Sequence, residues 1–228
     1  MTRSVVGSDT IDHAWCVRYD ATGKVTWKLS NNSVTPDFWS AGVQQVDGSF
    51  VLVGGRSFAT GTMLDPWRAT VSGAGALTTS MAYAQAGDNQ FNDAVLLADG
   101  SVVAVGFNRT SDLASSGTIA RLNAAGAAVW QKTLTGVSVD QLSGVAVLKN
   151  GDVVAAGGAG FKDKPACWFV RADQGGNIVW QQNACAEKLG AAYHVVTTPD
   201  GTFAAAGWAK NAGWVYRANG LGTTTCGN

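Results

Sequence analysis

A unit of about 51 residues recurs along the chain, and this repeat constrains the fold more than any other feature. Four strings align without gaps: VDGSFVLVGG at 46–55, ADGSVVAVGF at 98–107, KNGDVVAAGG at 149–158 and PDGTFAAAGW at 199–208. Their turn glycines, Gly48, Gly100, Gly151 and Gly201, lie 52, 51 and 50 residues apart. A fixed period of this size is typical of stacked supersecondary units.

Turn signals divide each unit into short strands. The Asp-Gly or Asn-Gly step in each string lies between two apolar runs, which predicts a hairpin with a two-residue type I′ turn. A second set of strings has five copies: VRYDATGKVTW (17–27), ATVSGAGALTT (69–79), ARLNAAGAAVW (120–130), VRADQGGNIVW (170–180) and YRANGLGTTTC (216–226). In each, a short polar residue stands three positions before a glycine, where its side chain can bond the turn backbone. Each unit therefore contains two hairpins.

Four antiparallel strands per unit, repeated without helical periodicity, predict an all-β fold, a β-propeller, in one domain over 1–228. We expect complete blades at about 40–80, 92–132, 143–182 and 192–226. Residues 3–30 supply only the second, third and fourth strands of a further blade. The leading interpretation is a five-bladed ring with an incomplete first blade. Four complete blades, or a fragment of a larger propeller, are the alternatives.

Composition excludes several classes of protein. The chain has 16 basic and 16 acidic residues, so it lacks the positive field that nucleic acid binding requires. No apolar run approaches the length of a membrane-spanning helix, which argues against membrane insertion.

The four cysteines have no CxxC spacing, so we expect no metal site. Pairs Cys167–Cys185 and Cys16–Cys226 are candidate disulfides, with buried thiols as the alternative. The polar start of the chain indicates either a cytosolic protein or removal of a leader, and removal favours an extracellular or periplasmic location.

The two sets of strings resemble bacterial propeller repeats that read approximately "DGGYIVAG" followed by "KLDSNGNVVWQKT". They are more distantly similar to blades of pyrroloquinoline-quinone dehydrogenases and of the outer-membrane assembly lipoprotein that shares their fold. The resemblance implies that Trp27, Trp130 and Trp180 head the fourth strand and pack between blades. Thr79 and Cys226 depart from that pattern. A sialidase function is not favoured, because the spacing from Asp20 to Gly23 is one residue longer than in the sialidase aspartate box.

Catalytic signatures are absent: the sequence has no GxSxG, HExxH, phosphate-binding loop or EF-hand pattern. His13, near Asp9 and Asp12, is expected in an exposed polar loop. His194 and Asp93 occupy one repeat position near the start of an innermost strand, and Tyr193, Asn92, Ser143 and Ser40 precede it. Inner strands converge on a propeller channel, so these side chains are the best candidates for a pocket. The alternative is that they are hydrogen-bonded rim groups.

The loops joining second and third strands vary most between units. Rigid scaffolds commonly place recognition residues on such loops. We expect ligand contacts from the aromatic and basic residues of these segments: Trp67, Trp208, Trp214, Arg56 and Lys162. A further basic position recurs at Arg18, Arg121, Arg171 and Arg217, where a structural partnership with a nearby turn residue competes with an anion site.

These features favour a non-catalytic, lectin-like binding module that recognises a carbohydrate or a protein and uses no cofactor. One alternative is a glycoside-acting enzyme with Asp93 and His194 in the channel, although only one carboxyl group is found at that position and glycosidases use two. The other alternative is a structural module that oligomerises through the open edge of its first blade.

Overall fold

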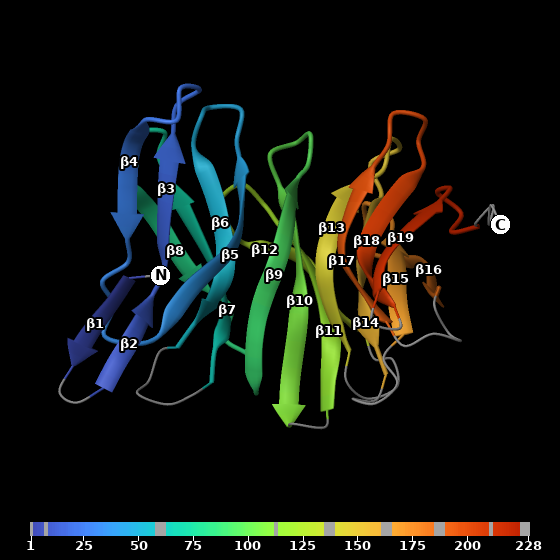
Figure 1. Ribbon diagram of the computed structural model, residues 1–228, viewed down its shortest axis with the longest axis horizontal. Coiled ribbons are helices and arrows are strands. Elements are labelled where there is room, and N and C mark those ends of the chain that lie inside the picture. Colours follow the sequence, from blue (N-terminus) through green and yellow to red (C-terminus); the bar gives the residue numbers. More distant parts are fainter. Residues whose placement is uncertain are drawn as a thin grey trace. The chain divides into compact units, whose positions relative to one another are not determined.

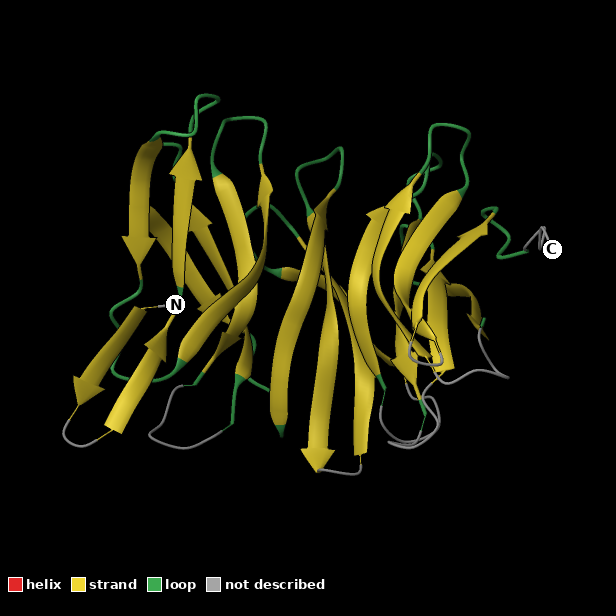
Figure 2. Cartoon of the chain, viewed as in Figure 1, coloured by secondary structure: helices red, strands yellow, loops and turns green. Residues whose placement is uncertain are grey.

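The computed structural model describes residues 2–6, 9–57, 63–111, 114–134, 140–160, 166–184, 190–209 and 212–223. Within these ranges the chain forms antiparallel strands and turns, without a helix (Figure 2). The all-β prediction is therefore confirmed. The chain folds as two compact units, Met1–Phe91 and Asn92–Asn228, each of which is described by itself.

The first unit holds two repeats. Repeat 1 consists of β1 (Thr2–Val6), β2 (Asp9–His13), β3 (Trp15–Tyr19) and β4 (Val25–Ser30), which pair as β1-β2 and β3-β4 (Figure 1). Repeat 2 is the sheet of β5 (Asp37–Gln44), β6 (Phe50–Arg56), β7 (Asp65–Val71) and β8 (Leu77–Ala82). Ala14 separates β2 from β3 because its N–H donates to the carboxylate of Asp37 (2.6 Å) rather than to a strand.

The second unit holds three repeats, and β9 begins just before it. Repeat 3 is β9 (Asp88–Leu96), β10 (Val102–Ser111), β11 (Ala114–Leu122) and β12 (Ala128–Leu134). Repeat 4 is β13 (Gln141–Val147), β14 (Val153–Ala159), β15 (Ala166–Ala172) and β16 (Ile178–Asn183). Repeat 5 is β17 (Gly190–Thr197), β18 (Phe203–Ala209) and β19 (Ala212–Ala218). Its expected fourth strand falls at 224–226, outside the described residues.

Both sets of hairpins are present, but the predicted type I′ geometry is wrong. At the first turn of repeat 2, the Gly48 N–H donates to the Gln45 carbonyl and the Gln45 N–H to the Ser49 carbonyl. The turn centre is therefore Val46–Asp47, and the glycine follows it with φ +84°. This is a three-residue loop with a left-handed glycine. The Asp47 carboxylate accepts from Ser49 N and Oγ, which favours this loop over the two-residue form.

Neighbouring repeats are joined by a recurring polar contact, which we call the Arg–Trp staple. Arg121 Nη1 and Trp130 Nε1 of repeat 3 both donate to the carbonyl of Gln174, in the second turn of repeat 4 (2.8 and 3.1 Å). Arg171 and Trp180 bond in the same way to the Gly220 carbonyl of repeat 5, and Arg18 and Trp27 to the Gly73 carbonyl of repeat 2. The recurring arginines at these three positions are thus structural.

Repeat 2 departs from this pattern. At the positions of the staple arginine and tryptophan it has Thr70 and Thr79, neither of which has a guanidinium or an indole. Repeat 2 is also the last complete repeat of the first unit. The sequence departure at Thr79 therefore coincides with the place where the chain divides into two compact units.

Candidate functional site

Three innermost strands, β5, β13 and β17, carry a β-bulge at one shared position. The register of β13 against β14 shifts between Leu142 and Gly144, and that of β17 against β18 shifts between Ala192 and His194. The extra residues are Ser143 and Tyr193, and β5 has the same shift around Ser40 in the first unit. Bulges re-aim side chains and often accompany functional sites. The bulges fall on the row of residues that the sequence grouped as a candidate pocket.

Asp93, on β9, bridges from repeat 3 to repeat 4. Its Oδ2 accepts from the Val145 N–H of β13 (3.0 Å), and the amide of the preceding Asn92 donates to the Leu142 carbonyl (2.7 Å). Burial raises the pKa of Asp93, an effect that the backbone hydrogen bonds of Val145 and Ala94 and the charge of His194 oppose. Asp93 is therefore a partly desolvated carboxyl group near an imidazole.

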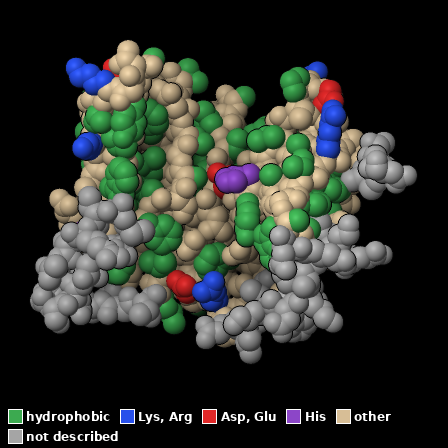
Figure 3. Space-filling view, in the orientation of Figure 1, with side chains coloured by type: hydrophobic (Ala, Val, Ile, Leu, Met, Phe, Trp, Pro, Cys, Tyr) green, Lys and Arg blue, Asp and Glu red, His purple; other side chains and the backbone are tan. Residues whose placement is uncertain are grey.

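Gly144 allows β17, which carries Tyr193 and His194, to lie close to β13, the strand that Asp93 contacts. A Cβ at Gly144 would stand 2.9 Å from His194 Cα and 3.0 Å from the Tyr193 carbonyl oxygen, so only glycine permits β13 to approach β17 this closely. His194 is exposed, and the Tyr193 side chain is 49% exposed. Figure 3 shows a histidine side chain against an acidic one, near the middle of the view. We call Asp93, Tyr193 and His194 the inner-strand cluster.

Trp67 and Arg56 do not lie as the sequence predicted. Trp67 was expected to expose its ring on a variable loop, but it lies in β7 with 0% exposure. Its ring stacks on Trp39 at 5.1 Å, and its Nε1 donates to Ser80 Oγ (2.8 Å). Arg56 ends β6, with its guanidinium 5.6 Å from the Trp67 ring. Strands β6 and β7 pair as far as Arg56 and Asp65, so both ends of the segment expected as loop, Arg56 and 65–67, lie in strands.

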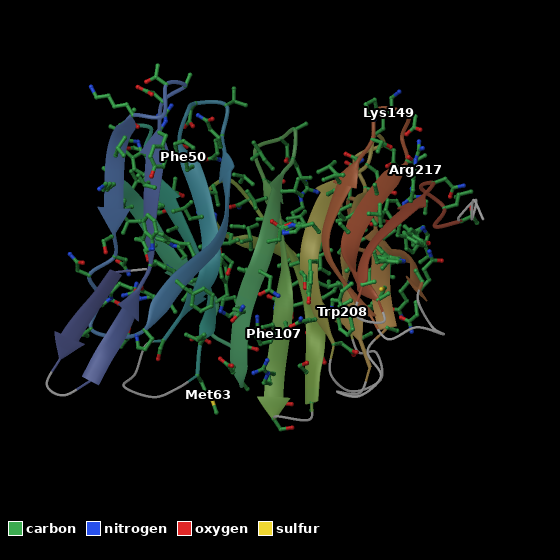
Figure 4. The ribbon with its side chains drawn as sticks, viewed as in Figure 1. Phe50, Met63, Phe107, Lys149, Trp208 and Arg217 are labelled. Atoms are coloured by element: carbon green, nitrogen blue, oxygen red, sulfur yellow. The ribbon has the colours of Figure 1, made fainter. Side chains whose placement is uncertain are left out.

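Trp208 and Trp214 also lie in strands, in β18 and β19, and both are half-buried. Trp214 stacks on Tyr216 at 5.3 Å and packs against Phe169 of repeat 4, so it belongs to the core between repeats. Figure 4 shows Trp208 and Arg217 toward opposite ends of the β18–β19 pair. Lys162 lies outside the described residues, and its binding role stays a prediction.

His13 and the cysteines carry no visible site. The expected exposed position of His13 is wrong, because His13 ends β2 and is 2% exposed. Cys167 is buried in β15, and burial raises the pKa of the Cys16 thiol to about 11, which suppresses its thiolate. Their expected partners, Cys185 and Cys226, lie outside the described residues. Within the described ranges no three His, Cys, Asp or Glu side chains gather as metal ligands, and no helix fit to cross a membrane occurs.

Two features escaped the sequence reasoning. Buried aspartates open the first strands of the repeats: Asp37 accepts from Ala14 N and Ser33 Oγ, and Asp140 accepts from Gly160 N. Their repeat spacing was the signal that could have revealed them. A cavity of about 250 Å³ also opens beside the exposed Arg217, lined by Thr202, Ala218, Asn219 and Thr223. It does not include the inner-strand cluster.

Structural comparison places this geometry among known folds. The chain is similar to a protein of unknown function from Dyadobacter fermentans (TM-score 0.60, 14% identity, 92% of this chain and 70% of that one). It is also similar to a Hadza microbial sialidase (TM-score 0.57, 12% identity, 88% and 52%) and to puromycin hydrolase (TM-score 0.51, 17% identity, 97% and 38%). The chain has a β-propeller fold. Identities this low show the fold alone, and the chain spans about half the length of the sialidase.

The propeller fold agrees with the sequence prediction, whereas the number of blades stays a prediction. No family model matches the chain, and no curated protein matches it in sequence. Because one propeller fold hosts many unrelated functions, the function has to be argued from the site.

Proposed function

We propose that the protein is a non-catalytic binding module that recognises a carbohydrate through Asp93, Tyr193 and His194. The observation that carries the proposal is the half-exposed Tyr193 ring at a β-bulge, adjacent in the chain to the exposed His194, whose charge acts on the carboxyl group of Asp93. An aromatic ring stacks on the apolar face of a sugar, while carboxyl and imidazole groups bond its hydroxyls. The proposed binding residues thus lie on the inner strands and not on the variable loops.

The carboxyl groups of the second unit support binding over hydrolysis. Glycoside hydrolysis uses two carboxyl groups that flank the scissile bond. In the described part of this unit, every aspartate other than Asp93 is engaged in a turn, a loop or an ion pair: Asp99, Asp140, Asp152, Asp173 and Asp200. One partly desolvated carboxyl group near a histidine suits hydrogen bonding to a hydroxyl, and among the described residues of this unit no second carboxyl group is left over to serve as the other acid.

Rigid placement is a second argument for binding. Asp93 is fixed by the Val145 N–H, and Gly144 fixes the approach of β17 to β13. Groups held by neighbouring strands lose little conformational freedom when a ligand binds, which lowers the cost of association. The arrangement therefore favours recognition of a preformed shape.

A glycan array followed by titration calorimetry tests the proposal. We expect Tyr193→Ala to lower the affinity for the tightest-binding glycan about tenfold or more, because it removes the stacking ring. Tyr193→Phe keeps the ring and is the matched control, so it should retain most of the affinity. Equal affinity of Tyr193→Ala and the native protein would overturn the proposal, as would a soluble peptide that binds this cluster in place of every glycan.

A further inference from the structure

One face of repeat 5 is exposed where the same face of the preceding repeat is covered. Val215 is 77% exposed, whereas Phe169, at the same position of repeat 4, is 0% exposed. Val196 is 59% exposed and its equivalent Ala146 is 7%. Repeat 5 itself covers Phe169 and Ala146, with Phe203, Ala205 and Tyr216. Repeat 5 therefore presents a packing face of the kind that joins repeats in the interior of the unit.

The exposed residues form a contiguous surface. In the register of the sheet, Ala206 lies opposite Val215, and Ala204 lies between Val196 and Arg217. We call Val196, Ala206, Val215 and Arg217 the tail face. Ala206 is exposed, although its equivalent Ala156 is 0% exposed.

Arg217 on the tail face is half of an Arg–Trp staple. Its Nη2 pairs with Asp200 and its Nε donates to Thr202 Oγ1, just as Arg171 pairs with Asp152 through the same strand position. Arg171 also donates Nη1 to the next repeat, and its side chain is 14% exposed. Arg217 is 62% exposed, and within the described residues no acceptor for its Nη1 is present. Arg217 also lines the cavity of about 250 Å³.

Repeat 1 carries the complementary face. Trp15 is 45% exposed, whereas Trp67 and Trp168, at the same repeat position, are 0% and 3% exposed. Trp168 packs on the preceding repeat, where its ring meets Gly117. The turn position that accepts the staple in repeats 4 and 5, at Gln174 and Gly220, corresponds to Ala21 in repeat 1. We call Trp15, Tyr19 and the Ala21 carbonyl the head face, and Tyr19 is 56% exposed.

We propose that the tail face of one chain binds the head face of a second copy, with Arg217 donating to the Ala21 carbonyl. A second copy is the expected occupant because this chain joins its own repeats by the same apolar contact and the same Arg-to-carbonyl bond. Such a head-to-tail contact is heterologous, so it uses two different surfaces and does not pair like with like. His194 belongs to the inner-strand cluster and lies opposite Ala206 of the tail face. The test therefore leaves His194 unchanged, so that each variant alters only one of the two surfaces.

Sedimentation velocity over a wide concentration range tests the proposal on the 228-residue chain of 23.5 kDa. We expect self-association of the native protein. Val215→Glu on the tail face and Trp15→Glu on the head face should each weaken it by about 30-fold or more, because an unpaired carboxylate is costly to bury. Arg217→Ala, which leaves the apolar face intact, should weaken it about tenfold. Val46→Glu, at a fully exposed turn position, is the matched control and should associate like the native protein.

Mixing the two glutamate variants gives the decisive result. Each retains one native face, so an equimolar mixture should form heterodimers and nothing larger, while each variant alone stays monomeric. A native protein that is monomeric at every concentration would overturn the proposal, as would a mixture that stays monomeric. Equal effects of Val46→Glu and Val215→Glu would do the same. Glycan binding by Tyr193 variants is measured separately, so its failure leaves this result intact.

Discussion

Two glycines with the same backbone conformation separate the cost of a turn from the cost of a contact between repeats. Gly100 has φ +80° and Gly176 has φ +84°, so an alanine at either position is forced into the left-handed region. A Cβ at Gly100 would meet nothing within 4 Å. A Cβ at Gly176 would stand 2.6 Å from Cδ2 of Trp130, in the preceding repeat. The pair therefore differs chiefly in the tryptophan.

The expected free energies of unfolding follow from these contacts. The left-handed conformation costs about 1–2 kcal/mol for either alanine. Gly176→Ala also pushes the Trp130 ring, which costs about 1–3 kcal/mol in a packed site. It endangers the Nε1 hydrogen bond of Trp130 to the Gln174 carbonyl, for about 0.5–1.5 kcal/mol more. We expect Gly176→Ala to be less stable than Gly100→Ala by about 2 kcal/mol or more, which lowers Tm by about 4–8 °C in a chain of this size.

Urea unfolding followed by circular dichroism measures the difference. A double-mutant cycle with Trp130→Ala supplies the control, because in that background the added methyl group has no indole to strike. The cost of Gly176→Ala should then fall to that of Gly100→Ala, with a coupling of about 2 kcal/mol. Equal destabilisation by the two alanines in the native background would refute the staple as a close-packed contact.

Three further outcomes are expected. Arg171→Ala should lower the free energy of unfolding by about 2–4 kcal/mol, measured in urea, because it leaves the buried carboxylate of Asp152 without its partner. Arg217 is exposed, so Arg217→Ala should change this free energy by no more than about 0.5 kcal/mol at concentrations where the protein is monomeric. Similar losses for the two variants would contradict this expectation. Burial raises the pKa of Asp93, so ionisation of this carboxyl group lowers the stability of the folded protein. This loss of stability is absent below the ordinary pKa of about 3.9 and complete above the raised pKa. Asp93→Asn should therefore raise Tm at neutral pH and leave it unchanged near pH 3, and a rise at both pH values would show that charge is not the cause. Asp37→Ala should cost about 2–4 kcal/mol because it leaves the Ala14 N–H and the Asn31 side-chain amide without the carboxylate that accepts from them. Unchanged proteolysis of the segment after β4 would contradict this expectation.

The fold was predictable because the same pattern of strands and turns recurs in every repeat of the sequence. Every repeat places a glycine where the backbone requires positive φ, and a short polar residue where the turn N–H groups need an acceptor. The type of the first turn was not predictable from Asp-Gly alone. The Asp47 side chain bonds the residue after the glycine, and this shifts the turn centre one residue toward the N-terminus.

The candidate site was only partly predictable. Repeat alignment grouped Asp93, Tyr193 and His194; in the structure Tyr193 is the bulged residue of β17, and Asp93 is partly buried near His194. Trp67 was misplaced because a long variable segment was interpreted as loop. Strand β7 begins at Asp65, which pairs with Arg56, so Trp67 lies within this strand and its ring is buried in the core. Sequence variation between repeats does not distinguish a changed core residue from an exposed one.

Agreement between repeats and departure from it therefore carry different information. Where the repeats agree, as at Arg121 and Arg171, the structure uses the side chain to join neighbours, and no ligand is needed to explain it. Arg217 is the informative exception, because it keeps the shared side chain and the shared ion pair while its side chain is 62% exposed. A guanidinium already oriented by Asp200 and Thr202 is organised to donate to a carbonyl oxygen at little further entropic cost. The same contact that builds the interior of the unit thus provides the physical basis for joining one chain to another.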